Sequence, residues 1–116
     1  MNIKHTNIQE ADFSPFTNVG APVGTPIPQI RTAAEQALPW AEVGIWECTV
    51  GKMERQIAEA EHMYFISGKG RFTPVGGEAI EIRAGDSLFL PAHTKGVWEI
   101  DETLRMSYAV FSNSAA

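Results

Sequence analysis

The chain has 116 residues, a formal net charge of −5 and 44% hydrophobic residues, which fits one globular domain and excludes a disordered chain. The acidic balance, without any block rich in lysine and arginine, argues against a nucleic-acid partner. No apolar run approaches the roughly 20 residues of a membrane helix, and the N-terminus lacks the apolar core of a signal peptide, so we expect a cytoplasmic protein without a membrane partner.

Residues 1–40 differ from the rest and predict an N-terminal arm that is not a separate domain. Prolines that break any long helix or central strand recur along it: Pro15, Pro22, Pro26, Pro28 and Pro39. Residues 32–38, TAAEQAL, predict one or two helical turns that end before Pro39. Such an arm would wrap its own barrel or pair with a neighbouring subunit.

From residue 41 onward, short apolar or alternating segments predict successive strands. The predicted strands cover residues 41–50, 52–58, 61–67, 71–75, 78–82, 87–90, 97–100 and 104–111. Turns are predicted at residues 68–70, at Gly76-Gly77 and at residues 84–86. Many short strands at regular spacing, with almost no helix, indicate an all-β sandwich or barrel over residues 41–116.

Cysteine and histidine usage bounds the metal chemistry. Cys48 is the single cysteine, so an intrachain disulfide and a cysteine-type zinc site are excluded. Its place in a predicted strand indicates a small buried hydrophobe. The three histidines, His5, His62 and His93, lie in unrelated contexts, which argues against a three-histidine site.

The segment from Gly85 to Trp98, GDSLFLPAHTKGVW, resembles the second signature of the cupin superfamily. In that signature a glycine, five residues and Pro-x-Gly lead to a metal-binding histidine. Here His93 stands where the glycine after the proline is expected, and Gly96 stands at the histidine position. The segment therefore implies a cupin barrel that lacks one of its usual metal ligands.

A second segment, Gly51 to Gly68, resembles the first cupin signature. Glu61 and Gly68 fit its second half, with six residues between them. The two histidine positions fall on Arg55 and Ile57, or on Glu54 and Gln56 with the longer spacing. Neither spacing supplies a histidine.

Residues 40–111 resemble the small single-domain cupins grouped with the ureidoglycine aminohydrolase-type cupin domain, a family that also holds relatives of an ethanolamine-utilisation component. The resemblance implies an all-β, RmlC-like jelly-roll barrel with an N-terminal arm. The true aminohydrolases are two-cupin proteins whose manganese ligands correspond to Arg55, Ile57, Glu61 and Gly96 here. Of these only Glu61 could bind a metal, so we predict no metal site and no cofactor.

Glu61 is the main candidate for a site residue, and a tentative catalytic one. Strand alternation places it with Met63 and Phe65 on one face. If that face lines the barrel, the carboxylate sits among apolar groups, and its pKa is raised. It would then be an acid–base group or a hydrogen-bond acceptor for a ligand. The alternative is a purely structural ion pair with Arg55.

Four further residues are predicted to bind ligand beside Glu61. Arg55 would clamp a carboxylate or phosphate, unless it is only a solvated strand residue. Trp46 and Trp98, with Tyr108, would form an aromatic wall, the alternative being ordinary core packing. Gly96 is expected to open space beside Trp98. His93 would reach the barrel mouth, unless it is an exposed turn residue.

These residues predict a small-molecule-binding cupin of undetermined activity, without the usual metal site and with its pocket around Glu61. The expected ligand is a small polar or anionic metabolite. One alternative is a divalent-metal enzyme of aminohydrolase or isomerase type, with Glu54, Gln56, Glu61 and His93 as ligands. Another is a non-catalytic accessory protein of a metabolic operon. Because both faces of residues 61–67 are apolar, we expect a homodimer.

Overall fold

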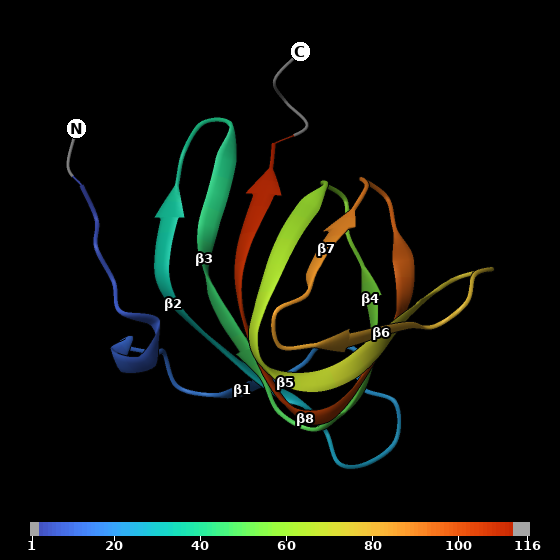
Figure 1. The fold of residues 1–116 in the computed structure, drawn as a ribbon. Helices are drawn as coiled ribbons and strands as arrows, with labels where there is room; N and C mark the ends of the chain where they lie inside the picture. The colour runs from blue at the N-terminus through green and yellow to red at the C-terminus, as the bar shows by residue number, and fades with distance from the viewer. Residues whose placement is uncertain (1–2, 113–116) are drawn as a thin grey trace.

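An antiparallel sheet of eight strands curls on itself to form a barrel in the computed structural model, which describes residues 3–112 (Figure 1). The elements in chain order are the 3-10 helix η1 (Ile8–Glu10) and the strands β1 (Thr17–Asn18), β2 (Gln29–Ala37), β3 (Ala41–Cys48), β4 (Gly51–Gln56), β5 (Glu61–Pro74), β6 (Ile80–Arg83), β7 (Ser87–Leu90) and β8 (Lys95–Phe111). Among the described residues no helix is long and apolar enough to cross a membrane. The predicted all-β barrel is confirmed.

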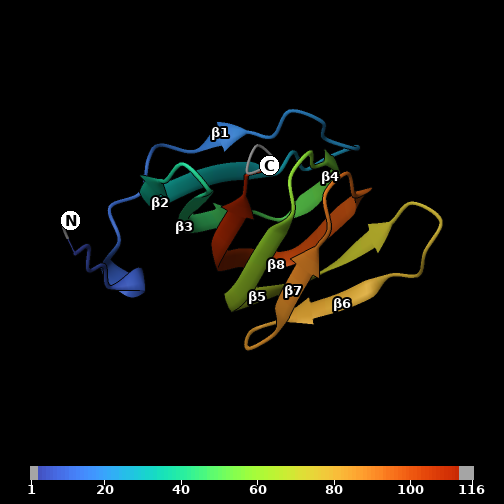
Figure 2. The same ribbon diagram turned by 90° about the horizontal axis from the view of Figure 1, so that it is seen from above.

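Two long strands, β5 and β8, pair along their lengths and belong to both walls of the barrel. Residues 104–111 of β8 pair with β3, while residues 95–100 pair with β4. Residues 61–64 of β5 pair with β7, while residues 69–72 pair with β6. Figure 1 shows both strands as long curved ribbons that pass from one wall into the other, and Figure 2 shows the same sheet from above.

The prediction of a turn at residues 68–70 is wrong, because β5 continues through this segment as a bent strand. Gly68 has a φ of 98°, and a Cβ placed on it would lie 2.2 Å from the carbonyl oxygen of Thr103 on β8. The pairing register shifts between Phe65 and Gly70. The glycines therefore serve a close backbone approach that bends the strand pair. Likewise, residues 97–100 and 104–111 form one strand rather than two.

The hydrophobic core fills the barrel between its two walls. Met63 and Phe65 are buried while His62 and Tyr64 are exposed, so β5 has the predicted alternation. Cys48 is fully buried, and burial raises the pKa of its thiol to about 12, which agrees with its expected role as a small buried hydrophobe. The predicted buried run at residues 87–90 is wrong in part, because in this edge strand Ser87 and Phe89 alternate outward.

The prediction of helical turns at residues 32–38 is wrong. These residues belong to β2, which pairs with β3 from Ile30 opposite Cys48 to Ala37 opposite Glu42. Pairing with an open sheet edge overrides a local sequence that favours helix. The register shifts beside Ala34, whose φ is 53°, so the strand accommodates the segment through a bulge.

The arm wraps its own barrel. The backbone N–H of Val23 donates to the carbonyl of Lys52 at 2.9 Å, and the N–H of Glu54 donates to the carbonyl of Ala21 at 2.9 Å. Residues 21–23 thus run along the outer edge of β4. The division of the chain at residue 40 stays a prediction, although β2 places part of the arm in the sheet.

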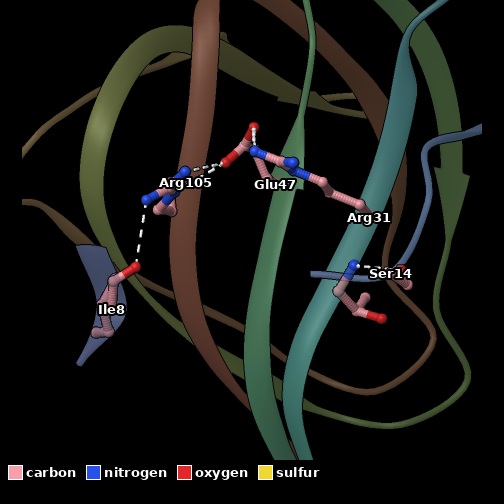
Figure 3. Close-up of polar contacts among 6 residues, drawn as sticks. Ile8, Ser14, Arg31, Glu47 and Arg105 are labelled. Atoms are coloured by element: carbon pink, nitrogen blue, oxygen red, sulfur yellow. Dashed lines mark hydrogen bonds and ion pairs between the residues drawn. The ribbon is translucent and has the colours of Figure 1, made fainter. Parts of the chain in front are cut away.

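A charged cluster on the outer face of the sheet fastens the arm (Figure 3). Buried Glu47 accepts hydrogen bonds from Arg31 Nη2 at 2.9 Å and from Arg105 Nε at 2.8 Å. Arg105 Nη1 also donates to the carbonyl of Ile8 at 3.2 Å. The guanidinium of Arg31 lies 4.4 Å from the centroid of the Phe13 ring. One buried carboxylate therefore joins β2, β3, β8 and η1.

Gly68→Ala tests the bend, and Gly85→Ala is its matched control. Both glycines have a positive φ, 98° and 95°, but only Gly68 is crowded by a facing strand. The control should lower the free energy of unfolding by about 1 kcal/mol through backbone strain alone. Gly68→Ala should lower it by about 3–5 kcal/mol because steric overlap is added. Urea denaturation measures both, and equal losses would contradict the assigned close approach.

Candidate functional site

A cavity of about 190 Å³ lies at the end of the barrel where β3 and β5 begin and β8 ends. Its wall combines charged, aromatic and aliphatic side chains from β3, β4, β5 and β8: Glu42, Trp46, Arg55, Glu61, Met63, Trp98, Met106, Tyr108 and Val110. The cavity therefore brings together four of the five predicted site residues, which are Arg55, Glu61, Trp46 and Trp98. Their role in binding stays a prediction.

Glu61, the first residue of β5, carries a buried carboxylate in this wall. The residue is 9% exposed, and Arg55 Nη2 donates a hydrogen bond to its Oε1 at 3.1 Å. Burial raises the pKa of Glu61 above its ordinary value, while the charge and hydrogen bond of Arg55 oppose the rise and the charge of Glu59 adds to it. A carboxylate whose protonation is favoured by burial is a candidate group for giving or accepting a proton.

Arg55 reaches the cavity from β4 and borders more than one hollow. Its side chain is 47% exposed, and it also lines two surface grooves outside the cavity. Trp46 is shared between the cavity and the first of these grooves, which Val19 and Ala21 of the arm also line. Arg55 is thus neither a freely solvated strand residue nor a fully buried one.

The expected aromatic wall is present, since Trp46, Trp98 and Tyr108 all line the cavity. Trp98 is nearly buried, and the ring of Phe72 packs against it with the centroids 5.1 Å apart. The expectation that Gly96 opens space beside Trp98 is wrong. A Cβ on Gly96 would lie 2.5 Å from Cζ of Phe72, so the Phe72 ring already fills that space.

The phenol of Tyr108 lies in an acidic environment. Burial raises the pKa of Tyr108 to about 12, and the charges of Glu42, Glu35 and Glu61 contribute to the rise. The hydroxyl therefore stays protonated at neutral pH and is available as a hydrogen-bond donor. It lies over Gly44, where a Cβ would come within 2.7 Å of the phenolic oxygen.

Sequence reasoning did not identify Glu42 as a site residue, and it expected His93 at the mouth of the barrel, where the structure does not place it. Glu42 lines the cavity and lies an even number of residues along β3 from Trp46, so the alternation that gave Trp46 could have found it. His93 is exposed in the turn after β7, with a φ of 67°, and is absent from the cavity wall.

The residues at the usual metal positions of this fold do not suit a metal. Arg55 is a cation, Ile57 is buried in the core, and Gly96 has no side chain. Only Glu61 supplies an oxygen, and it is paired with Arg55. Within residues 3–112, no group of three histidine, cysteine, aspartate or glutamate side chains is placed to hold a metal ion.

The alternative ligand set also separates in space. Glu54 and Gln56 line the grooves outside the barrel, whereas Glu61 lines the cavity. This separation follows from β4 itself, where Arg55 points inward and its two neighbours point to the other face. These side chains therefore do not converge on one ion.

The raised pKa of Glu61 predicts a pH-dependent stability. Between the ordinary pKa and the raised one, the folded state holds a proton that the unfolded chain has lost, so the stability of the wild type falls as pH rises through this window. Glu61→Gln cannot ionise and should gain stability relative to the wild type over the same range. The attraction of Arg55 acts on the ionised carboxylate and is already included in the net rise of the Glu61 pKa.

Urea denaturation between about pH 4 and pH 8 measures this difference. Glu102→Gln, an exposed position on β8, is the control and should follow the wild type throughout. A difference between Glu61→Gln and wild type that does not change with pH would contradict the effect of burial on Glu61.

Solved structures of cupins share this fold. EutQ from Clostridium difficile matches with a TM-score of 0.68 and 17% identity, over 84% of this chain and 77% of that one. A DUF861 protein of unknown function from Pseudomonas syringae matches with a TM-score of 0.70 and 22% identity, over 86% of this chain but only 43% of its own length. At these identities the likeness shows the fold alone.

A DUF861 protein from Thermotoga maritima is 28% identical, with a TM-score of 0.56, over 58% of this chain and 76% of that one. The comparison with curated proteins gave no match. The model of the EutQ-like cupin domain matches residues 36–108, which contain β3 to β7 and most of β8. That match does not single out the ureidoglycine aminohydrolase type, which stays a prediction. The chain belongs to the family of EutQ-like cupin domains.

Proposed function

We propose that this cupin binds a small polar molecule in the barrel cavity, with Glu61 at the centre of the site. The supporting observation is the pairing of Arg55 with the buried Glu61 carboxylate at 3.1 Å, in a cavity walled by aromatic rings. Ligand sites commonly combine an apolar wall with a few polar groups that fix orientation. Trp46 and Trp98 would supply the wall here, and Arg55 and Glu61 the polar groups.

If the protein is also an enzyme, the Glu61 carboxylate that binds the ligand would be the catalytic group. The raised pKa of Glu61 would suit it to transfer a proton to or from a bound molecule. The likeness to the ureidoglycine aminohydrolase-type domain remains a proposal about lineage. It does not carry over that enzyme's reaction, because the side chains of Arg55, Ile57 and Gly96 are not metal ligands.

If the protein is a non-catalytic accessory protein, the cavity is only a packing defect and binds no ligand. The buried carboxylate argues against this, because placing a charged group in an apolar wall lowers stability unless its partners compensate. The two roles therefore differ in whether small molecules bind in the cavity.

We also propose that the chain forms a homodimer through the outer face of β5 and β7. Tyr64 is 48% exposed and Phe89 is 57% exposed, and both lie on the face opposite the barrel interior. Their strands are neighbours, with His62 opposite Phe89 and Tyr64 opposite Ser87. Large exposed aromatic side chains on adjacent strands suit burial against a second copy of the same surface.

Filling the cavity tests the proposed binding site. Val110→Phe places a ring into the cavity wall, while Val50→Phe adds the same ring at an exposed turn residue. We expect at least one compound from a panel of small amines, alcohols and carboxylates to raise the melting temperature of wild type and Val50→Phe. A ligand at about a hundred times its Kd adds about 2.7 kcal/mol of stability.

The shift should be lost in Val110→Phe, and thermal denaturation measures it. A panel without any effect on the wild type would count against binding in the cavity. A shift that survives in Val110→Phe would place the binding elsewhere.

Tyr64→Glu tests the proposed dimer. A charge on the contact face should convert the dimer to a monomer in sedimentation velocity at micromolar concentration, because a buried unpaired carboxylate weakens an interface. Val75→Glu, at an exposed residue between β5 and β6, is the control and should leave the dimer intact. A monomeric wild type would refute the proposal.

A further inference from the structure

The charges that line the barrel cavity do not cancel. When both carboxylates are ionised, Glu42 and Glu61 outnumber the single cation Arg55, and the wall carries a net charge of −1. Glu35 is near enough for its charge to act on Tyr108, which adds to the negative potential at the mouth. A bound anion would therefore meet net repulsion, whereas a single positive charge would neutralise the wall.

The carboxylate of Glu61 has one oxygen available to a ligand. Arg55 Nη2 bonds Oε1, and within residues 3–112 Glu61 makes no other side-chain hydrogen bond. Among residues 3–112 the one fully buried side-chain atom without a hydrogen-bond partner is Arg31 Nε, so Oε2 of Glu61 is reached by water from the cavity. A charged N–H donor can replace that water and makes a stronger hydrogen bond to the carboxylate than a neutral donor does. The cavity that Glu61 lines is where such a donor would sit.

Arg55 does not offer the same opportunity to an anion. Its guanidinium is already paired with Glu61. A carboxylate or phosphate bound to Arg55 would either break this pair or become a third negative charge in the cavity, beside Glu42 and Glu61. The anionic ligand expected from Arg55 alone is thus disfavoured by its surroundings. In its present position Arg55 holds the Glu61 carboxylate in one orientation.

The remaining wall suits an apolar substituent. Met63, Met106 and Val110 are aliphatic, and Trp46 and Trp98 present ring surface. Trp98 is fixed by Phe72, so this part of the wall is preformed. Aromatic faces also attract cations, which adds to the effect of the two carboxylates.

We infer that the cavity binds a small primary amine in its ammonium form, with the N–H groups on Glu61 Oε2 and Glu42 and the carbon chain against the two tryptophans. This inference rests on the proposed binding function and specifies its ligand class. A primary ammonium has three donors, which suits two carboxylates that face one cavity.

Three compounds with the same branched carbon skeleton test the ligand class: isopentylamine, isopentyl alcohol and isovalerate. At neutral pH they present an ammonium, a hydroxyl and a carboxylate. Calorimetric titration of the wild type should show the amine binding at least about tenfold more tightly than the alcohol, and isovalerate more weakly still, because a hydrogen bond between charged groups contributes more than a neutral one.

Two variants assign the charge recognition to residues. Glu42→Gln and Glu61→Gln should each weaken isopentylamine binding about tenfold and leave the alcohol nearly unchanged. Glu102→Gln removes the same charge at an exposed position outside the cavity and should bind all three compounds as the wild type does. Equal losses in Glu102→Gln and Glu61→Gln would overturn the inference, because net charge rather than the cavity would then be responsible.

The outcomes separate this inference from the proposed function. Tighter binding of isovalerate or of the alcohol than of the amine, abolished by Val110→Phe, would overturn the amine and leave the binding cavity standing. If none of the three compounds binds the wild type, the amine is refuted. If the wider panel then also fails in thermal denaturation, the proposed function fails with it.

Discussion

The close backbone contact between β5 and β8 is the constraint on which the rest of the barrel depends. At Gly68 and Gly70 a side chain would collide with the backbone of Thr103 and Glu99, so the two longest strands can cross from one wall to the other only with glycine there. The shifts in pairing register fall in the same stretch of β5. The bend of β5 and its close approach to β8 are therefore one feature, and this feature allows the barrel to close.

That bend also places the site. One half of β5 carries Glu61 and one half of β8 carries Tyr108, while the other half of β8 carries Trp98 from the facing wall. Arg55 enters from β4, which pairs with that second half of β8. The cavity therefore joins residues from both walls. None of its polar groups would meet without the crossing strands.

The sequence predicted the parts of this arrangement that depend on alternation within one strand. The inward direction of Glu61, Met63 and Phe65 follows from a period of two. What failed needed contacts between strands. The ring of Phe72 over Gly96 and the continuation of β5 past Gly68 arise from distant partners, and glycine alone indicates a turn as readily as a close approach. Residues 32–38 became a strand only because β3 offered an edge.

The two buried carboxylates illustrate different uses of the same residue type. Glu47 accepts hydrogen bonds from two arginines, and this cluster joins the arm to the sheet. Glu61 accepts a hydrogen bond from one arginine through Oε1, and a cavity lies beside it. Apolar residues of similar volume commonly stabilise a protein as well as a buried ion pair does, or better. Glu47 has a structural role because its two arginines fasten the arm, whereas Glu61 has a single arginine and faces a cavity, so the proposed binding of a ligand would account for its burial.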